Sequence, residues 1–300
     1  MRFNSVLAYA LSVTLTQALP HAIRDGKYSR LVVFGDSFSD NGNGAWVASD
    51  HKWPVDPAYY NHSFSNGPKW NEVAAKDLGL ELLDLATGGA TTDNTYIAGG
   101  TGPDSTIPVP SAADQIAKFL KEDKVRPNDI FVHWIGANDI LFDNTASPEK
   151  VAGLIKDHID LLRANGARAV LVANYNDITK FPGTYNSDYY KTANVKSYND
   201  ALTEKLKSLV RKYRCTTFKA GFVDITEIFR SIYSNPAKFG VKKKYLEPPT
   251  ACLTGVYKSE GVERNLCSDP EKHIWFDAYH VVQEVHTLMG KKFEKHIRVL

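Results

Sequence analysis

Short runs of apolar, often β-branched residues alternate with longer amphipathic segments along most of this chain. Each short run is predicted as a strand, and the five strands are expected at residues 30–34, 82–85, 129–135, 168–173 and 216–223. Helices are expected between and after them, at residues 68–78, 111–122, 147–165, 194–213 and 281–300. Strands separated by helices of this length favour a parallel sheet covered on both faces, which is an α/β fold.

The composition is that of an ordinary globular protein. The 300 residues are 43% hydrophobic, which is enough for one sizeable domain. No internal repeat or low-complexity linker interrupts the pattern, so a single domain is expected over residues 28–300. The formal charge of +2 gives no electrostatic footprint for nucleic acid or an anionic membrane. We therefore expect no nucleic-acid partner. A monomer is also expected.

The first residues have the layout of a secretory signal peptide. A positive start at Arg2 precedes an apolar stretch at residues 6–15 and a small-residue cleavage site at residues 16–18. The stretch is too short to span a bilayer comfortably. A signal peptide is therefore predicted at residues 1–18, followed by a loose leader at residues 19–27. The alternative is a buried first helix. The signal peptide predicts a secreted, extracellular protein.

Three cysteines and one sequon agree with that compartment. Cys252 and Cys267 bracket a stretch rich in glycine and charge, where a disulfide would hold a segment with little apolar content. Cys215 is then left as a buried thiol, although three cysteines allow three single pairings. The sequon at Asn61 predicts a glycosylated, exposed loop.

Polar or small residues follow the predicted strands. Ser37 follows the first strand, Gly88-Gly89 the second and Asn138 the third. Asp277 and His280 come after the last strand and directly before the final helix. Because ligands of open α/β sheets bind outside the carboxyl ends of the strands, these segments are expected to meet at one rim.

These residues are the types that acyl transfer requires. The reaction needs a nucleophile, a base, a group that orients the base, and donors for the oxyanion. Ser37 on a strand-to-helix turn can be the nucleophile, and Asp277 three residues before His280 can orient that imidazole as the base. Taken singly, each motif has a structural alternative. The serine and Gly88-Gly89 can be plain turns, and Asn138 can be a helix cap.

Four blocks in this order resemble the GDSL-type lipases and esterases of the SGNH hydrolase superfamily. They are FGDSFSDNGN at residues 34–43, ATGGATT at 86–92, GAND at 136–139 and DAYH at 277–280, with FSNGP at 64–68 as a further similarity. The resemblance implies a three-layer α/β/α sandwich with a parallel, five-stranded, flavodoxin-like sheet, and neither cofactor nor metal. It also implies an oxyanion hole made by the backbone N–H groups of Ser37 and Gly89 and the side chain of Asn138. One position departs from the pattern, because Val281 stands where a proline commonly follows the histidine.

The leading hypothesis is a carboxylic ester hydrolase with Ser37, His280 and Asp277 as its triad. Within the enzyme class the alternatives are a lipase or phospholipase and an acyltransferase. The alternative from another class is an inactive secreted binding protein.

The stretch from residue 46 to 70 is rich in aromatic residues and interrupted by prolines, so Trp46, Trp70 and Asn66 are predicted to bind substrate. The alternative is that these rings pack the loop onto the domain. Short acyl groups, with acetylated carbohydrate as the natural class, are expected because no long apolar channel or lid is evident.

Overall fold

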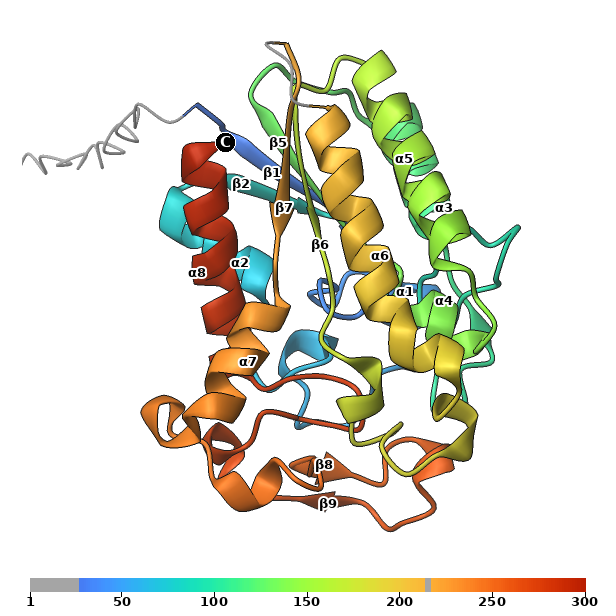
Figure 1. Ribbon diagram of the computed structural model, residues 1–300, viewed down its shortest axis with the longest axis vertical. Helices are drawn as coiled ribbons and strands as arrows, with labels where there is room; N and C mark the ends of the chain where they lie inside the picture. The colour runs from blue at the N-terminus through green and yellow to red at the C-terminus, as the bar shows by residue number, and fades with distance from the viewer. Residues whose placement is uncertain (1–26, 214–216) are drawn as a thin grey trace, which may run out of the picture.

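The computed structural model describes residues 27–213 and 217–300. The signal peptide predicted at residues 1–18, most of the leader predicted at residues 19–27, and Cys215 lie outside the described residues. The chain ends in a helix beside the central sheet (Figure 1).

A five-stranded parallel sheet forms the centre of the molecule, in the order β2-β1-β5-β6-β7. The strands are β1 (Arg30–Gly35), β2 (Glu81–Asp84), β5 (Asp129–Trp134), β6 (Ala169–Ala173) and β7 (Lys219–Val223). This is the flavodoxin-like order, in which the chain runs outward in one direction from β1 and then in the other. Every residue of β1, β5 and β6 is buried, as the apolar runs predict for a sheet covered on both faces. The predicted fold class is confirmed.

Long helices cover both faces of the sheet (Figure 1). One face carries α2 (Trp70–Leu78) and α8 (Gln283–Val299), and the other carries α3 (Ala112–Glu122), α5 (Pro148–Ala164) and α6 (Ala193–Lys212). Each of these helices begins and ends within two residues of its predicted bounds. Ser111 caps α3 by accepting a hydrogen bond from the N–H of Asp114, and Gly79, with a φ of 67°, ends α2.

The helices α2 and α8 pack closely against each other. The ring of Trp70 stacks on that of Phe293, with centroids 3.8 Å apart. A Cβ on Gly290 would lie 2.8 Å from the Cβ of Val73, so the small residue lets the two helices approach. This packing fixes α8 and therefore the segment directly before it, which contains Asp277 and His280.

Several shorter elements were not predicted. They include the helices α1 (Ala45–Ala48), α4 (Ala137–Phe142) and α7 (Thr226–Ser234), and two small antiparallel pairs, β3 (Gly100–Thr101) with β4 (Ile107–Pro108) and β8 (Leu253–Thr254) with β9 (Asn265–Leu266). Short 3₁₀ helices complete the structure: η1 (Tyr60–His62), η2 (Ile178–Lys180), η3 (Asp188–Tyr190), η4 (Pro236–Phe239), η5 (Lys243–Tyr245), η6 (Lys258–Glu260) and η7 (Pro270–Lys272).

Most of these shorter elements gather at one end of the molecule. Figure 1 shows them below the sheet, where the strands end and where β8 and β9 lie. The turns after β1, β2 and β5 reach the same end, as expected for the carboxyl edge of a parallel sheet. None of the described helices is long and apolar enough to cross a membrane.

Candidate active site

Ser37 lies in a tight turn at the carboxyl end of β1. Gly35 closes the strand, and a Cβ at this position would lie 2.6 Å from a backbone oxygen of β5, which leaves room for glycine alone. The carboxylate of Asp36 accepts hydrogen bonds from the N–H of Phe38 at 3.0 Å and the hydroxyl of Tyr175 at 2.7 Å. These contacts fix the turn that brings the Ser37 side chain to a pocket.

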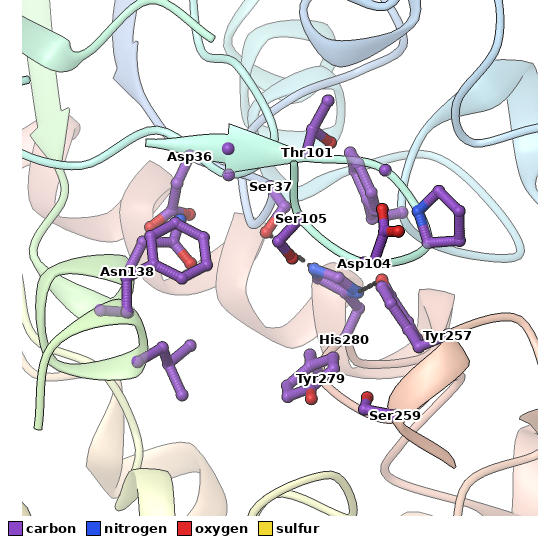
Figure 2. A pocket seen from close by; sticks show the side chains of 18 of the residues that line it. Asp36, Ser37, Thr101, Asp104, Ser105, Asn138, Tyr257, Ser259, Tyr279 and His280 are labelled. Atoms are coloured by element: carbon purple, nitrogen blue, oxygen red, sulfur yellow. Dashed lines mark hydrogen bonds between the residues drawn. The ribbon is translucent and has the colours of Figure 1, made fainter. Parts of the chain in front are cut away.

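The three residues of the predicted triad are hydrogen-bonded in series. Nε2 of His280 lies 2.7 Å from Oγ of Ser37, a residue 243 positions away in the chain. Nδ1 of the same imidazole lies 2.8 Å from Oδ1 and 2.9 Å from Oδ2 of Asp277. Figure 2 shows the imidazole between Ser37 and Tyr257. This is the arrangement that lets a serine pass its proton to a histidine held by a carboxylate.

Asp277 is completely buried, but it is surrounded by donors. Burial alone would raise the pKa of this carboxyl group. The charge of His280 and the hydrogen bonds from its imidazole, from the Tyr59 hydroxyl and from the N–H of Tyr279 instead hold the pKa of Asp277 below its usual value. The carboxylate is therefore ionised at neutral pH and can orient the imidazole.

Two residues that line the pocket have a backbone N–H without an acceptor among the described residues. Among the hydrogen bonds of the described residues, none is donated by the N–H of Ser37 or of Gly89, and both residues line the pocket. Gly89 has a φ of 86°, and a Cβ there would lie 2.0 Å from the carbonyl oxygen of Gly100. Only glycine fits this position, and its free N–H can be donated to a substrate oxygen.

Asn138 reaches the same pocket from the first turn of α4. Its side-chain amide donates one hydrogen bond to the carbonyl oxygen of Ala90, at 2.8 Å. The amide carries a second hydrogen, which remains for a ligand. The alternative interpretation of Asn138 as a helix cap is wrong, because Gly136 occupies the cap position.

Two further aspartates join the motif blocks to one another. The Asp40 carboxylate accepts hydrogen bonds from the N–H groups of Gly42, Gly44, Ala45 and Gly88, at 2.7–3.0 Å. Asp139 likewise accepts hydrogen bonds from the N–H and the hydroxyl of Thr92, both at 3.0 Å. Burial raises the pKa of Asp139 to about 7, although the hydrogen bonds from Thr92 oppose this. Both aspartates lie in the motif blocks of the sequence, but the motifs do not indicate these roles.

The pocket has a volume of about 320 Å³, and Ser37 and His280 line it. One group of apolar side chains comes from α4, from the residue after η2, from η3 and from the turn before His280: Leu141, Phe142, Phe181, Tyr190 and Tyr279. A polar group comes from the β3–β4 hairpin and from η6: Thr101, Asp104, Ser105 and Ser259 (Figure 2). The pocket can therefore take an ester with an apolar acyl part and a polar remainder.

The three residues predicted to bind substrate lie elsewhere, and these predictions need correction. Trp70 is fully buried between the helices α2 and α8. The Asn66 side chain accepts a hydrogen bond from the N–H of Gln283 and so fixes the start of α8. Trp46 stacks on His62, with ring centroids 3.6 Å apart, and is not among the residues that line the pocket. The alternative interpretation, in which the rings of this stretch pack onto the domain, describes Trp70. Trp53 and Phe64 are also buried, but both line the pocket.

The disulfide between Cys252 and Cys267 is confirmed. It closes the segment that carries β8, η6 and β9. Within the described part of the chain, Cys267, Asp269 and His273 lie close enough together to suggest a metal site. The sulfur of Cys267 is bonded to Cys252, however, so only Asp269 and His273 remain as ordinary ligands.

The site lies at the carboxyl edge of a parallel sheet and contains a serine, a histidine and an aspartate hydrogen-bonded in series. This fold and this set of side chains are those of an α/β serine hydrolase. The chain belongs to the GDSL-like lipase/acylhydrolase family, whose model matches residues 31–293. It is therefore a carboxylic ester hydrolase.

The individual proteins that the chain resembles have low sequence identity to it. The chain is 29% identical to a phosphatidylcholine-sterol acyltransferase of Aeromonas hydrophila over 77% of its own length and 67% of that protein. It is 25% identical to an acetylesterase of Hypocrea jecorina, over 90% of the chain and 88% of that protein. Among solved structures, an aryl esterase of M. smegmatis has a TM-score of 0.52 at 14% identity and covers 91% of this chain and 99% of its own. This last similarity concerns the fold alone.

Proposed function

We propose that the protein hydrolyses carboxylic esters through an acyl-enzyme on Ser37. Oγ of Ser37 attacks the acyl carbon while Nε2 of His280 takes its proton and then gives it to the leaving alcohol. A water molecule next gives a proton to His280 and attacks the acyl-enzyme, and the proton returns to Ser37 as the acid leaves. The 2.7 Å separation between Oγ of Ser37 and Nε2 of His280 carries this proposal.

The negative charge that develops on the acyl oxygen needs donors. We assign this role to the N–H groups of Ser37 and Gly89 and to the side chain of Asn138. The two N–H groups have no acceptor among the described residues, and all three residues line the pocket. Donors that are in place before the reaction stabilise the transition state without having to reorganise. The proposed mechanism uses no cofactor and no metal.

Short acyl groups are the proposed substrates, with acetyl esters of carbohydrates as the natural class. Ligand pockets range from about 300 to 1,000 Å³. The present volume of about 320 Å³ is at the small end and must also admit the leaving group. The similarity to an acetylesterase supports the acetyl group. Trp46 and Trp70 do not line the pocket, so a sugar would instead contact Trp53 and the polar side chains of Asp104, Ser105 and Ser259, which do line it.

A lipase, phospholipase or acyltransferase is the second candidate. The apolar side chains of Leu141, Phe142 and Phe181 on one wall of the pocket favour it, as does the similarity to an acyltransferase that acts on phosphatidylcholine and sterol. An inactive binding protein is disfavoured, because a scaffold that had lost turnover would have no need of a serine and a histidine at hydrogen-bonding distance.

A panel of esters tests the proposal. Acetyl, butyryl and palmitoyl esters of one leaving group are compared first, and then acetylated xylo-oligosaccharides, with and without an added alcohol as acceptor. The proposal predicts the highest kcat/KM for acetyl esters, measurable turnover of the sugars, and loss of nearly all turnover in Ser37→Ala. A rate that rises toward palmitoyl with no reaction of the sugars supports a lipase, and an ester formed with the alcohol supports an acyltransferase.

We also propose that the protein is secreted after removal of residues 1–18, and that Asn61 is glycosylated. Asn61 is exposed in η1, where an oligosaccharide can be attached without disturbing the core. The disulfide between Cys252 and Cys267 suits an oxidising compartment. Sequencing the amino terminus of the mature protein tests the cleavage site, because a terminus at Met1 in the medium would contradict it.

A further inference from the structure

The two oxygens of the Asp277 carboxylate have different partners. Oδ1 accepts hydrogen bonds from the backbone N–H groups of Tyr279 and His280, both at 2.8 Å. Oδ2 accepts a hydrogen bond from the hydroxyl of Tyr59, at 2.6 Å. The imidazole of His280 lies 2.8 Å and 2.9 Å from the two oxygens. Tyr59 is therefore the main side-chain donor to this carboxylate apart from the histidine that it orients.

Tyr59 is held rigidly although it comes from a loop 218 residues away. Its side chain is 4% exposed, and its ring makes edge-on contacts with those of Phe64 and Phe276, at centroid separations of 6.3 Å and 5.5 Å. Burial and the nearby charge of Asp277 raise the pKa of Tyr59 well above its usual value. The hydroxyl therefore keeps its proton and acts as a permanent donor.

Tyr257 approaches the same place from the segment that the disulfide closes. Its hydroxyl lies 3.4 Å from Oδ2 of Asp277. It also lies 3.4 Å from Nδ1 of His280, as Figure 2 shows. These distances exceed those of an ordinary O–H···O hydrogen bond, so its contact is the weaker of the two. The Glu260 carboxylate holds this segment by accepting a hydrogen bond from the Tyr257 N–H at 2.9 Å.

A carboxylate can orient a histidine only while it is ionised and held in one rotamer. Hydrogen bonds to the charged form favour ionisation, and a fixed donor on Oδ2 prevents the carboxylate from turning about its Cβ–Cγ bond. Lys69, which is fully buried, is a further charged group whose field reaches Asp277. We propose that Tyr59, assisted by Tyr257, is a positioning residue of the triad that holds the Asp277 carboxylate in place for His280. This inference rests on the proposed triad of Ser37, His280 and Asp277.

Removing each hydroxyl while keeping its ring tests the inference. In Tyr59→Phe we expect kcat to fall about 10- to 100-fold with KM little changed, because a hydrogen bond to a charged group is lost while the pocket is kept. The acid limb of the kcat/KM profile should move to higher pH, because the carboxylate is less stabilised as an anion. Tyr257→Phe should show both effects to a smaller extent. A merely structural tyrosine would not move the acid limb.

Tyr213→Phe is the matched control. Its hydroxyl also donates to a carboxylate, that of Asp160 at 2.8 Å, but it does so between the end of α6 and α5, and neither residue lines the pocket. We expect wild-type kcat and an unchanged pH profile in this variant. If Tyr59→Phe behaves like Tyr213→Phe while the wild type turns over esters and Ser37→Ala does not, the inference is wrong and the proposed function stands.

Failure of the proposed function has a different signature, since the wild type would then be inactive or Ser37→Ala would keep its activity. Circular dichroism checks that each variant is folded at the assay temperature. If Tyr59→Phe is unfolded, Tyr257→Phe decides the question: a shifted acid limb with unchanged KM supports the positioning role, and a wild-type profile overturns it.

Discussion

At the scale of the residue, Asn138 shows how one side chain can be both held and available. Its amide donates to the carbonyl oxygen of Ala90, which fixes the orientation of the group. The second amide hydrogen is left for the pocket, which is also lined by Gly89, whose N–H has no acceptor among the described residues. In the ester hydrolysis proposed above, these groups would donate to the oxygen on which the negative charge develops.

The corresponding prediction concerns Asn138→Ala. We expect kcat to fall by about 100-fold or more with a small change in KM, since an oxyanion donor acts mainly in the transition state. Asn165→Ala is the control, because the Asn165 amide also donates to a backbone oxygen, that of Leu161, at the exposed end of α5. Steady-state kinetics on an acetyl ester compare the two. Equal rates for both variants would contradict the role assigned to Asn138.

Some residues of the site carry a local signature and others do not. Ser37, Gly89, Asn138, Asp277 and His280 each sit in a short motif, so the sequence predicted that they meet, and they do. Tyr59 contacts Asp277 across 218 positions, and nothing in its neighbourhood indicates this contact.

The prediction that Trp70 binds substrate is wrong, because the helical spacing around Trp70 places it in the core. Trp70 and Ala74 are four residues apart on the inward face of α2, and this spacing is typical of a buried helix face. The spacing was visible in the sequence and could have placed Trp70 in the core.

At the scale of the element, a pair of buried histidines joins α5 to the sheet. Nε2 of His133, in β5, lies 3.0 Å from Nδ1 of His158, in α5. Burial lowers the pKa of His158 to about 4, and burial and the neighbouring His158 hold the pKa of His133 well below its usual value. Both rings are therefore neutral in the folded protein near neutral pH.

This pair predicts an acid-dependent loss of stability. A histidine in the unfolded chain takes up a proton near pH 6.5, whereas the folded pair does not until about pH 4. The free energy of unfolding should therefore fall from pH 6.5 toward 4, by about 1.4 kcal/mol per pH unit for each proton. In His158→Gln the dependence of the free energy of unfolding on pH should be shallower by up to one proton. Part of the dependence should remain, because the buried His286 also has a lowered pKa. Urea unfolding at pH 7.5, 6.0 and 5.0 measures both slopes, and identical slopes would refute the assignment.

The elements that were predicted and those that were missed differ in length. Long amphipathic helices such as α6 and the apolar strands repeat their pattern often enough to be recognised. The sequence of the six-residue helix α4 predicts a polar turn, because Asn138 and Asp139 contact neighbouring loops instead of following an apolar stripe. The small pairs β3–β4 and β8–β9 have two residues in each strand, which is too few for an alternation to be visible.

At the scale of the whole molecule, the sheet positions the site residues that follow its strands. The loops at the carboxyl edge of the sheet supply the other residues of the site. The disulfide closes one of these loops over a sequence separation of 15 residues, and that loop brings Tyr257 to the triad. Lys258 joins the same loop to the β3–β4 hairpin, because its N–H donates to the carbonyl oxygen of Pro103 at 2.9 Å.

Loss of this disulfide should therefore cost stability. For a loop of this length the chain-entropy account gives about 3 kcal/mol. Urea unfolding of the wild type is compared with that of a double variant, Cys252→Ser with Cys267→Ser, and we expect the free energy of unfolding to fall by about that amount. Peptide mapping without reduction should find Cys215 as a free thiol. Equal stability of the two proteins, or Cys215 in a bridge, would contradict this part of the account.

In the proposed mechanism His280 and Asp277 activate Ser37 as a nucleophile, and covalent labelling by a fluorophosphonate measures this activation directly. An activated serine oxygen attacks the phosphorus and displaces fluoride, whereas ordinary serine hydroxyls react very slowly. The account predicts one labelled peptide, containing Ser37, in the wild type, no label in Ser37→Ala, and a labelling rate strongly reduced in His280→Ala. A label on another serine, or an equal labelling rate in wild type and His280→Ala, would contradict the account.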